Sequence, residues 1–251
     1  MKLARMPDGR PEIFFTLQGE GRNIGRPSIF IRSSLCNLHC HWCDTDYTWN
    51  WQDTHFTHEK DADPSYQKYR REEQIIDCSA GEIVTAVSTY PCRHFVFTGG
   101  EPLIQEKAWT TLMSALKEAD AASTFEIETN GTLFPGPEFL DTIDQINVSP
   151  KLANSMVPEE MRTRPEVLRQ LAETGKVDFK FVVSSRDELG EILELLNAIS
   201  LPLDRVFLMP KANSVIELEA NQAETAALAQ SHGFRYSDRL HLRLFGAKRG
   251  V

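Results

Sequence analysis

Three cysteines within eight residues are the part of this chain best suited to chemistry. Cys36, Cys40 and Cys43 have C-x3-C-x2-C spacing, and most of the residues between them are polar. A 4Fe–4S cluster normally takes four thiolates, so three would leave one iron with an open coordination position. Open positions on metals are where substrates bind and react, as at catalytic zinc sites. The spacing therefore predicts a reactive iron–sulfur site.

Other interpretations of the cysteines stay open at this level. Positions i, i+4 and i+7 share one helix face, so the triplet could be a buried apolar stripe, although its polar neighbours disfavour this. A disulfide is disfavoured because the chain has five cysteines, an odd number, and is far longer than domains that need such links. A zinc site would need a histidine as fourth ligand. The candidates are His39, His41, His55 and His58.

A second motif follows an apolar stretch at 94–98. Thr98-Gly99-Gly100-Glu101-Pro102 is typical of a strand that ends in a ligand-binding turn. Two glycines let backbone approach a ligand closely, and a carboxylate suits an ammonium group. The two motifs, about 60 residues apart, are together a stronger signature than either one.

Composition limits the class of protein. Lys and Arg number 27 against 36 Asp and Glu, which gives a net charge of −9 without basic blocks. Such a chain is a poor candidate for binding nucleic acid. No apolar run approaches the ~20 residues of a membrane span, and residues 1–11 have no apolar signal core. Free cysteines predict a reducing, cytoplasmic setting.

Strand and helix patterns alternate along the chain. This order predicts parallel βαβ units that form an open, partial six-stranded β/α barrel. We expect a single domain over 1–251, with a variable insertion at about 46–77, where apolar periodicity is weak. The predicted strands are 28–32, 94–98, 124–128, 145–148, 177–183 and 205–209. The predicted helices are about 79–90, 105–122, 165–174, 185–199 and 217–232.

Ligands in parallel α/β sheets bind at the carboxyl ends of the strands. That rule predicts that five segments meet on one rim of the barrel. They are the cysteine loop, Thr98–Pro102, Glu128–Gly131, Ser149–Lys151 and Met209–Lys211.

The cysteine motif, with aromatic Trp42 just before its last cysteine, and the GGEP turn resemble the radical S-adenosylmethionine (SAM) superfamily. Further segments are similar to the 7-carboxy-7-deazaguanine synthase family and cover most of the chain outside the insertion. They are Leu17-Gln18-Gly19-Glu20-Gly21, Gly25–Arg32, Asp44-Thr45, Glu128–Thr132 and Ser149-Pro150-Lys151.

The resemblance implies a reaction and its cofactors. 6-Carboxy-5,6,7,8-tetrahydropterin is rearranged to 7-carboxy-7-deazaguanine with loss of ammonia, a step towards queuosine and related deazapurines. The implied cofactors are one 4Fe–4S cluster per chain on Cys36, Cys40 and Cys43, SAM, and Mg²⁺ at Thr45. The radical formed from SAM performs the chemistry, so no protein acid or base is expected.

The resemblance also assigns binding residues. SAM is expected at Trp42, Gly99, Gly100, Glu101, Glu128, Ser149, Pro150 and Lys151. Substrate is expected at Leu17, Gln18, Gly19, Glu20, Arg32 and Thr98. Arg32 suits a bidentate contact with the substrate carboxylate, and Gln18 suits a pterin edge. His241 and the Val251 carboxylate are candidates to close the pocket.

Two other functions compete with this one. A radical SAM activating enzyme that acts on a partner protein would share the cysteine loop and GGEP, but would lack the LQGEG and Asp44-Thr45 pattern. A zinc-stabilised binding module would need no redox chemistry. The expected partners are the pterin substrate, an external electron donor similar to flavodoxin, and a second copy in a homodimer, with no nucleic acid and no membrane.

Overall fold

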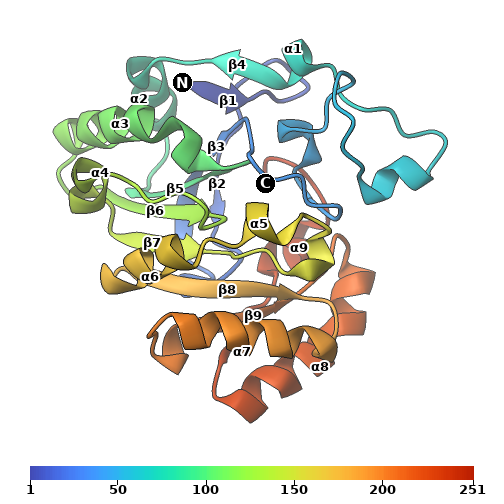
Figure 1. Ribbon diagram of the computed structural model, residues 1–251. Helices are drawn as coiled ribbons and strands as arrows, with labels where there is room; N and C mark the ends of the chain where they lie inside the picture. The colour runs from blue at the N-terminus through green and yellow to red at the C-terminus, as the bar shows by residue number, and fades with distance from the viewer.

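One mixed sheet of ten strands forms the centre of the computed structural model, which describes residues 1–251 (Figure 1). The strand order is β10-β9-β8-β7-β6-β5-β3-β1-β4, and β2 pairs with β3 outside this path. The strands are β1 (Lys2–Ala4), β2 (Ile13–Leu17), β3 (Pro27–Ser33), β4 (Ile75–Asp77), β5 (His94–Gly99), β6 (Thr124–Thr129), β7 (Gln145–Val148), β8 (Val177–Val183), β9 (Val206–Pro210) and β10 (Arg235–Tyr236).

The six predicted strands are all present as β3 and β5 to β9. Each pairs in parallel with the next, as the alternation of strands and helices predicts. β3 and β9, at the two ends of this series, do not pair with each other, so the barrel is open. The two-residue strand β10 extends the parallel series beyond β9.

The antiparallel part of the sheet was not predicted. β2 pairs with β3, while β1 lies between β3 and β4. β1 and β4 have three residues each, too few for an alternating pattern to emerge from the sequence. β4 also shows that the last residues of the predicted insertion belong to the edge of the sheet.

Helices cover the outer face of the sheet (Figure 1). All five predicted helices are present, and the structure adds short ones at α1, α4, α5 and α9. The helices are α1 (Arg71–Gln74), α2 (Ala80–Val87), α3 (Glu106–Ala119), α4 (Pro137–Thr142), α5 (Glu159–Arg162), α6 (Pro165–Glu173), α7 (Leu189–Ala198), α8 (Val215–His232) and α9 (Leu240–Phe245).

Alternation along the strands gives the sheet two different faces. On β6, Phe125 and Ile127 belong to the apolar core beneath the helices, whereas Glu126 and Glu128 point to the inside of the barrel. Lys180 on β8 is likewise an interior residue between two core phenylalanines. The inside of the open barrel is therefore polar and able to hold a polar ligand.

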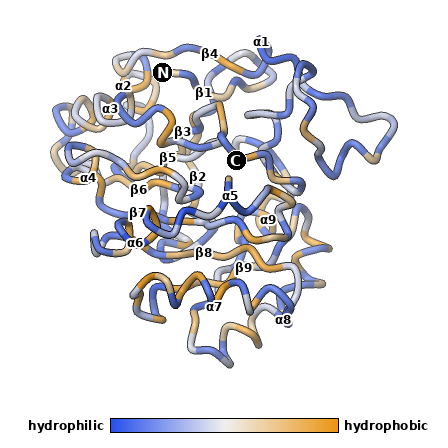
Figure 2. Tube along the Cα trace, in the orientation of Figure 1, coloured by the Kyte–Doolittle hydropathy of each residue, from blue (hydrophilic) through white to orange (hydrophobic).

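The predicted insertion forms a largely hydrophilic excursion beside the barrel mouth (Figure 2). It contains two 3-10 turns, η1 (Asp46–Thr48) and η2 (Glu59–Ala62). The buried carboxylate of Asp46 accepts from Lys60 Nζ at 2.9 Å and from the Tyr66 hydroxyl at 2.7 Å, which holds the excursion together. No helix in the structure has the length and apolar character that crossing a membrane requires.

Candidate active site

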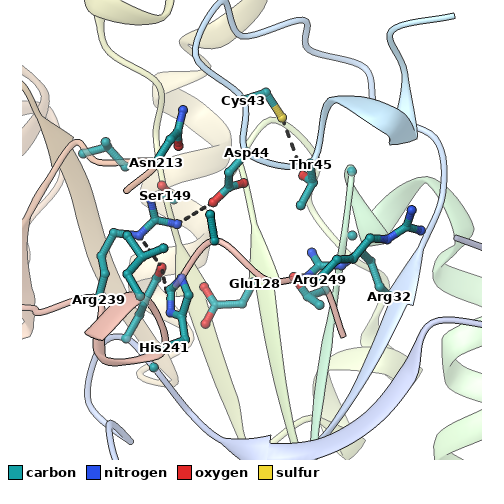
Figure 3. Close-up of a pocket in the computed structure, with 18 of the residues that line it drawn as sticks. Arg32, Cys43, Asp44, Thr45, Glu128, Ser149, Asn213, Arg239, His241 and Arg249 are labelled. Atoms are coloured by element: carbon teal, nitrogen blue, oxygen red, sulfur yellow. Dashed lines mark hydrogen bonds and ion pairs between the residues drawn. The ribbon is translucent and has the colours of Figure 1, made fainter. Parts of the chain in front are cut away.

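A cavity of about 460 Å³ opens at the carboxyl ends of the parallel strands (Figure 3). This volume lies within the usual range for small-molecule sites. The cavity brings together sixteen of the eighteen residues predicted to bind a cluster, a metal, SAM or substrate. Glu101 and Pro150 do not line it. Residues of α9 and of the C-terminal segment 246–251 also reach the cavity.

The three motif cysteines are free thiols on one loop and line this cavity. Residues 34–45 contain no helix, so the interpretation as a helical stripe is wrong. Burial raises the pKa of Cys36, Cys40 and Cys43, and the nearby Cys43 thiol adds to the increase at Cys36 and Cys40. Three adjacent soft donors facing one cavity fit an iron–sulfur cluster.

Two of the four histidines considered as zinc ligands are engaged elsewhere. His39 stacks on Phe56, with ring centroids 3.4 Å apart. His58 accepts from the Lys60 amide at Nδ1, so Nε2 carries the proton and donates to the Cys43 carbonyl at 2.8 Å. No group of three or more His, Cys, Asp or Glu side chains is arranged to hold a single metal ion. The zinc interpretation is not favoured.

The two glycines of the GGEP turn pack against the cysteine loop. The Gly100 amide donates to Ser33 O at 3.3 Å, and the Glu101 amide donates to Leu35 O at 2.8 Å. A Cβ on Gly100 would overlap Leu35 O and lie 2.8 Å from the Cys36 Cβ. Glycine is required here because the backbones of the two motifs touch.

Glu101 does not face the cavity as the SAM assignment expected. Its buried carboxylate accepts from the amides of Leu103 at 2.9 Å and Asn130 at 2.7 Å, and from Thr129 Oγ1 at 2.8 Å. Glu101 therefore links the turn after β5 to the turn after β6. Its role is to position both loops.

Trp42, Ser149 and Lys151, which the resemblance assigns to SAM, lie together on one wall of the cavity. Lys151 Nζ donates to Ser149 Oγ at 3.0 Å and lies 5.6 Å from the centre of the Trp42 ring. The Trp42 indole donates to Asn154 O at 3.0 Å. This wall carries a cation beside an aromatic face near the cysteines.

Gln18 is more deeply engaged with the protein than the substrate assignment expected. Its side-chain nitrogen donates to Glu126 at 2.5 Å and to Glu128 at 3.3 Å. Its side-chain oxygen accepts from the Glu20 amide at 3.3 Å. Both amide hydrogens are used, so only acceptor capacity is left for a ligand.

Sequence reasoning missed the two cations that hold Glu20. Lys180 Nζ donates to Glu20 Oε2 at 2.6 Å and to Glu128 Oε2 at 3.0 Å, and Arg239 Nε donates to Glu20 Oε1 at 3.1 Å. Although burial raises the pKa of Glu20, Lys180 and Arg239 bring it well below its ordinary value. The sequence did contain a signal for Lys180. It is a lysine within the mainly apolar strand Val177–Val183, on the face of the strand that points into the barrel.

Glu128 lies with the residues predicted to bind substrate. Besides Lys180, its carboxylate contacts Gln18 and the Asn147 side-chain nitrogen, the latter at 2.9 Å. Burial raises the pKa of Glu128, and the neighbouring Glu126 and Glu20 add to the increase against the pull of Lys180. The assignment of Glu128 to the SAM ribose is therefore not supported by its neighbours.

Arg32 lies at the opposite side of the cavity, next to the C-terminal segment (Figure 3). Its Nε donates to the buried Glu12 at 2.8 Å, and its terminal nitrogens make no hydrogen bond in the protein. Glu12 also accepts from Tyr47 at 3.0 Å and from Arg249 at 2.8 Å. Glu12, which the sequence did not single out, thus holds Arg32 in place and fastens the end of the chain.

His241 closes the cavity against Gly19. The Leu240 amide donates to Gly19 O at 2.9 Å, and a Cβ on Gly19 would overlap the His241 ring. Burial lowers the pKa of His241, so its ring is neutral at pH 7. The contact explains why glycine occupies this position of the LQGEG segment.

Thr45 and Asp44 supply oxygen atoms at the mouth of the cavity (Figure 3). Thr45 Oγ1 lies 3.5 Å from Cys43 Sγ, and the Asp44 carboxylate pairs with Arg239.

The two remaining cysteines, Cys78 and Cys92, do not line this cavity. Cys78 packs in the core, and Cys92 donates to Pro27 O.

An open parallel barrel with a three-thiol loop at its mouth defines the class of protein. Residues 30–200 match the Radical SAM superfamily. Three 7-carboxy-7-deazaguanine synthases are similar over nearly the whole chain. The relative from Pyrobaculum aerophilum is 35% identical over 95% of each chain. Those from Halobacterium salinarum and Rhodopirellula baltica are both 34% identical, over 93% and 96% of this chain and 89% and 87% of theirs. The chain belongs to the 7-carboxy-7-deazaguanine synthase family of radical SAM enzymes.

A solved structure agrees with the fold. The crystal structure of QueE from Escherichia coli superimposes with a TM-score of 0.65 at 24% sequence identity, covering 96% of this chain and 95% of that one. The open barrel expected from the sequence is confirmed.

Proposed function

We propose that this protein converts 6-carboxy-5,6,7,8-tetrahydropterin to 7-carboxy-7-deazaguanine with release of ammonia, in queuosine biosynthesis. Family membership makes it a lyase with an iron–sulfur cluster and SAM. The observation that carries the proposal is one cavity that joins the three-thiol loop to a polar floor and to Arg32, whose terminal nitrogens make no hydrogen bond in the protein. An activating enzyme acting on a protein partner is not favoured, because the similarity to the synthases extends along nearly the whole chain.

The polar floor suits the amino-pyrimidinone edge of a pterin. Each Glu20 oxygen accepts one bond from the protein and keeps capacity for another, as does the Gln18 side-chain oxygen. Glu128 adds a carboxylate beside them. These acceptors match the N–H groups of the substrate and favour a ligand rich in donors.

Arg32 suits the substrate carboxylate at the other side of the cavity. Because Glu12 holds its Nε, the two terminal nitrogens present a fixed fork to the cavity. A guanidinium fork binds carboxylate through two parallel hydrogen bonds. Thr98, whose partner on the neighbouring strand is Arg32, lines the cavity beside it.

Cys36, Cys40 and Cys43 are the proposed ligands of the cluster. When bound, the cluster and SAM supply the electron and the carbon radical that begin the reaction. Lys151 offers its ammonium to the SAM carboxylate, and Trp42 offers a flat face beside it. Gly99 and Gly100 keep the turn close to the cysteine loop, so SAM and cluster share one wall.

Thr45 is the proposed protein ligand of Mg²⁺. Its hydroxyl is a hard oxygen at the cavity mouth, and Asp44 beside it adds negative charge. Mg²⁺ commonly takes one or two protein oxygens and completes its shell with water and substrate. Activity that is unaffected by chelation of Mg²⁺ would remove Thr45 from the proposal.

A product assay tests the function directly. The protein is reconstituted anaerobically with iron and sulfide, then given SAM, Mg²⁺, dithionite and 6-carboxytetrahydropterin. We expect 7-carboxy-7-deazaguanine by mass spectrometry and one ammonia per product. Cys40→Ala should lose the cluster and the product, whereas Cys92→Ala should keep both. A cluster-bearing protein that makes no product would overturn the substrate assignment.

The remaining parts of the proposal concern partners and location. Reduction of the cluster calls for an external electron donor of the flavodoxin type, and the family resemblance favours a homodimer. Five free thiols favour the reducing cytoplasm. Sedimentation and electron-transfer assays with a reduced flavodoxin test the first two points.

A further inference from the structure

Glu126 lies in a layer of polar residues beneath the floor of the cavity. It comes from the inner face of β6, two positions before Glu128, and its side chain is fully buried. Unlike Glu128 and Gln18, it does not line the cavity. A buried carboxylate in such a place depends on donors from the protein itself, so its partners show what it does.

Four side-chain donors surround the Glu126 carboxylate. Its Oε1 accepts from Gln18 Nε2 at 2.5 Å and from Asn147 Nδ2 at 2.6 Å. Its Oε2 accepts from Asn23 Nδ2 at 2.5 Å and from His94 Nε2 at 3.1 Å. An ionised carboxylate has about four acceptor positions. All of them are taken, so Glu126 has no capacity left for substrate and acts only through its neighbours.

The surroundings of Glu126 favour its ionised form. Although burial alone would raise the pKa of Glu126, hydrogen bonds from His94 and Asn23 bring it below the ordinary value. Since an ionised carboxylate only accepts, the His94 Nε2 that faces it carries a proton. The other ring nitrogen, Nδ1, lies 2.9 Å from Thr124 Oγ1. Every side chain around Glu126 therefore presents a donor to it.

The charge of Glu126 also decides which way the Gln18 amide points. The two ends of a side-chain amide have nearly the same shape, but the nitrogen donates and the oxygen accepts. Gln18 Nε2 is 2.5 Å from Glu126 and 3.3 Å from Glu128, so the contact with Glu126 dominates. A reversed amide would place its oxygen against a carboxylate oxygen. The Gln18 oxygen consequently points the other way, where the Glu20 amide takes one of its two acceptor positions.

We propose that Glu126 is a positioning residue that sets the polarity of the Gln18 amide, so that an acceptor and not a donor faces the substrate. This inference deepens the proposed function and rests on the assignment of Gln18 to the substrate floor. A site built to accept hydrogen bonds selects a ligand that carries N–H groups. With the amide reversed, an N–H of the protein would face an N–H of the pterin. Glu126 thus contributes to substrate recognition without touching the substrate.

A double-mutant cycle on pterin binding tests the inference. Glu126→Gln keeps the size of the side chain but offers an N–H, towards which Gln18 can turn its oxygen. Gln18→Met removes the amide that Glu126 orients. 6-Carboxytetrahydropterin is titrated anaerobically, without reductant, into the cluster-loaded protein with SAM and Mg²⁺, so that binding is measured without turnover. We expect Glu126→Gln to raise the dissociation constant roughly tenfold, about the effect of one hydrogen bond, and to add little once Gln18 is Met.

Asp178→Asn is the matched control. Asp178 is 2% exposed, lies on the same face of β8 as Lys180, and pairs with Arg22. Its replacement should lower stability and leave the dissociation constant unchanged. An equal increase for Glu126→Gln in both backgrounds, the same increase in Asp178→Asn, or no increase at all would overturn this inference. A cluster-loaded, unmodified protein that does not bind the pterin would instead overturn the proposed function.

Nuclear magnetic resonance covers the case in which Glu126→Gln does not fold. Glutamine labelled with ¹⁵N in the side chain is incorporated into the unmodified protein with its cluster oxidised, and the Gln18 signals are those missing from Gln18→Met. Because both N–H groups point to carboxylates, we expect them to exchange slowly with D₂O even before the pterin is added. Rapid exchange that slows only with the pterin would place the nitrogen in the cavity and overturn the inference.

Discussion

Lys180 donates to Glu20 across 2.6 Å, although 160 residues separate them in the chain. The lysine comes from the inner face of β8 and the glutamate from the segment after β2. The same ammonium holds Glu128 at 3.0 Å, so two carboxylates in the floor of the cavity share one buried cation. Together with Arg239, this arrangement fixes the polar groups that we propose to bind substrate.

Replacement of Lys180 by Met should destabilise the protein strongly. Two buried carboxylates would lose their shared counter-charge, and removal of one partner of a buried ion pair costs roughly 3–5 kcal/mol of unfolding free energy. Urea unfolding near neutral pH measures the change. Lys107→Met, on the exposed surface of α3, is the control and should change stability little. Equal stability of both variants would contradict the structural role of Lys180.

Acid should remove the stabilising effect of Glu20. Although burial opposes it, Lys180 and Arg239 lower the pKa of Glu20 in the folded protein below the ordinary value of 4.5. A depressed folded pKa stabilises the protein above the unfolded pKa, and the effect is lost as pH falls below it. The difference in unfolding free energy between the unmodified protein and Glu20→Gln should therefore be full at neutral pH and shrink below about pH 4.5. If the difference in unfolding free energy grew as the pH fell, the predicted direction of the pH dependence would be wrong.

Replacement of Gly100 by Ala should impair cluster assembly while leaving the barrel folded. The added Cβ would overlap Leu35 O and press on Cys36, so the cysteine loop must move. Iron content after reconstitution measures the effect, and circular dichroism checks the fold. Gly81→Ala in α2 is the control, because no atom lies within 4 Å of its added Cβ. Normal iron content in Gly100→Ala would show that the loop tolerates the displacement.

Replacement of Arg32 by Met should weaken substrate binding and spare the cluster. Loss of two charge-assisted hydrogen bonds should raise the KM for the pterin by ~10- to 100-fold, at about 1.4 kcal/mol for each factor of ten. Steady-state kinetics at saturating SAM tests this. Arg26→Met removes an exposed guanidinium that donates to Thr124, and its KM should stay unchanged. An unaltered KM in Arg32→Met would remove Arg32 from the substrate site.

The parallel half of the sheet and the two motifs of the candidate site follow from local patterns in the sequence. Val177–Val183 and Gln145–Val148 were predicted with their observed bounds, because a buried parallel strand is a short apolar run between turn residues. The cysteine motif and the GGEP turn are each a short, continuous stretch of sequence, so each could be interpreted without knowledge of the fold. Their placement on one rim followed from the rule for parallel strands.

Which polar groups remain available to a ligand depends on long-range contacts that no local pattern shows. Glu101 was expected to bind SAM, but its carboxylate already accepts hydrogen bonds from Leu103, Thr129 and Asn130. Lys180 and Glu12 act through partners far away in the sequence. Hydrogen bonding and charge pairing depend on distances of a few ångströms, and those distances arise only when β8, the C-terminal segment and the insertion close around the cysteine loop.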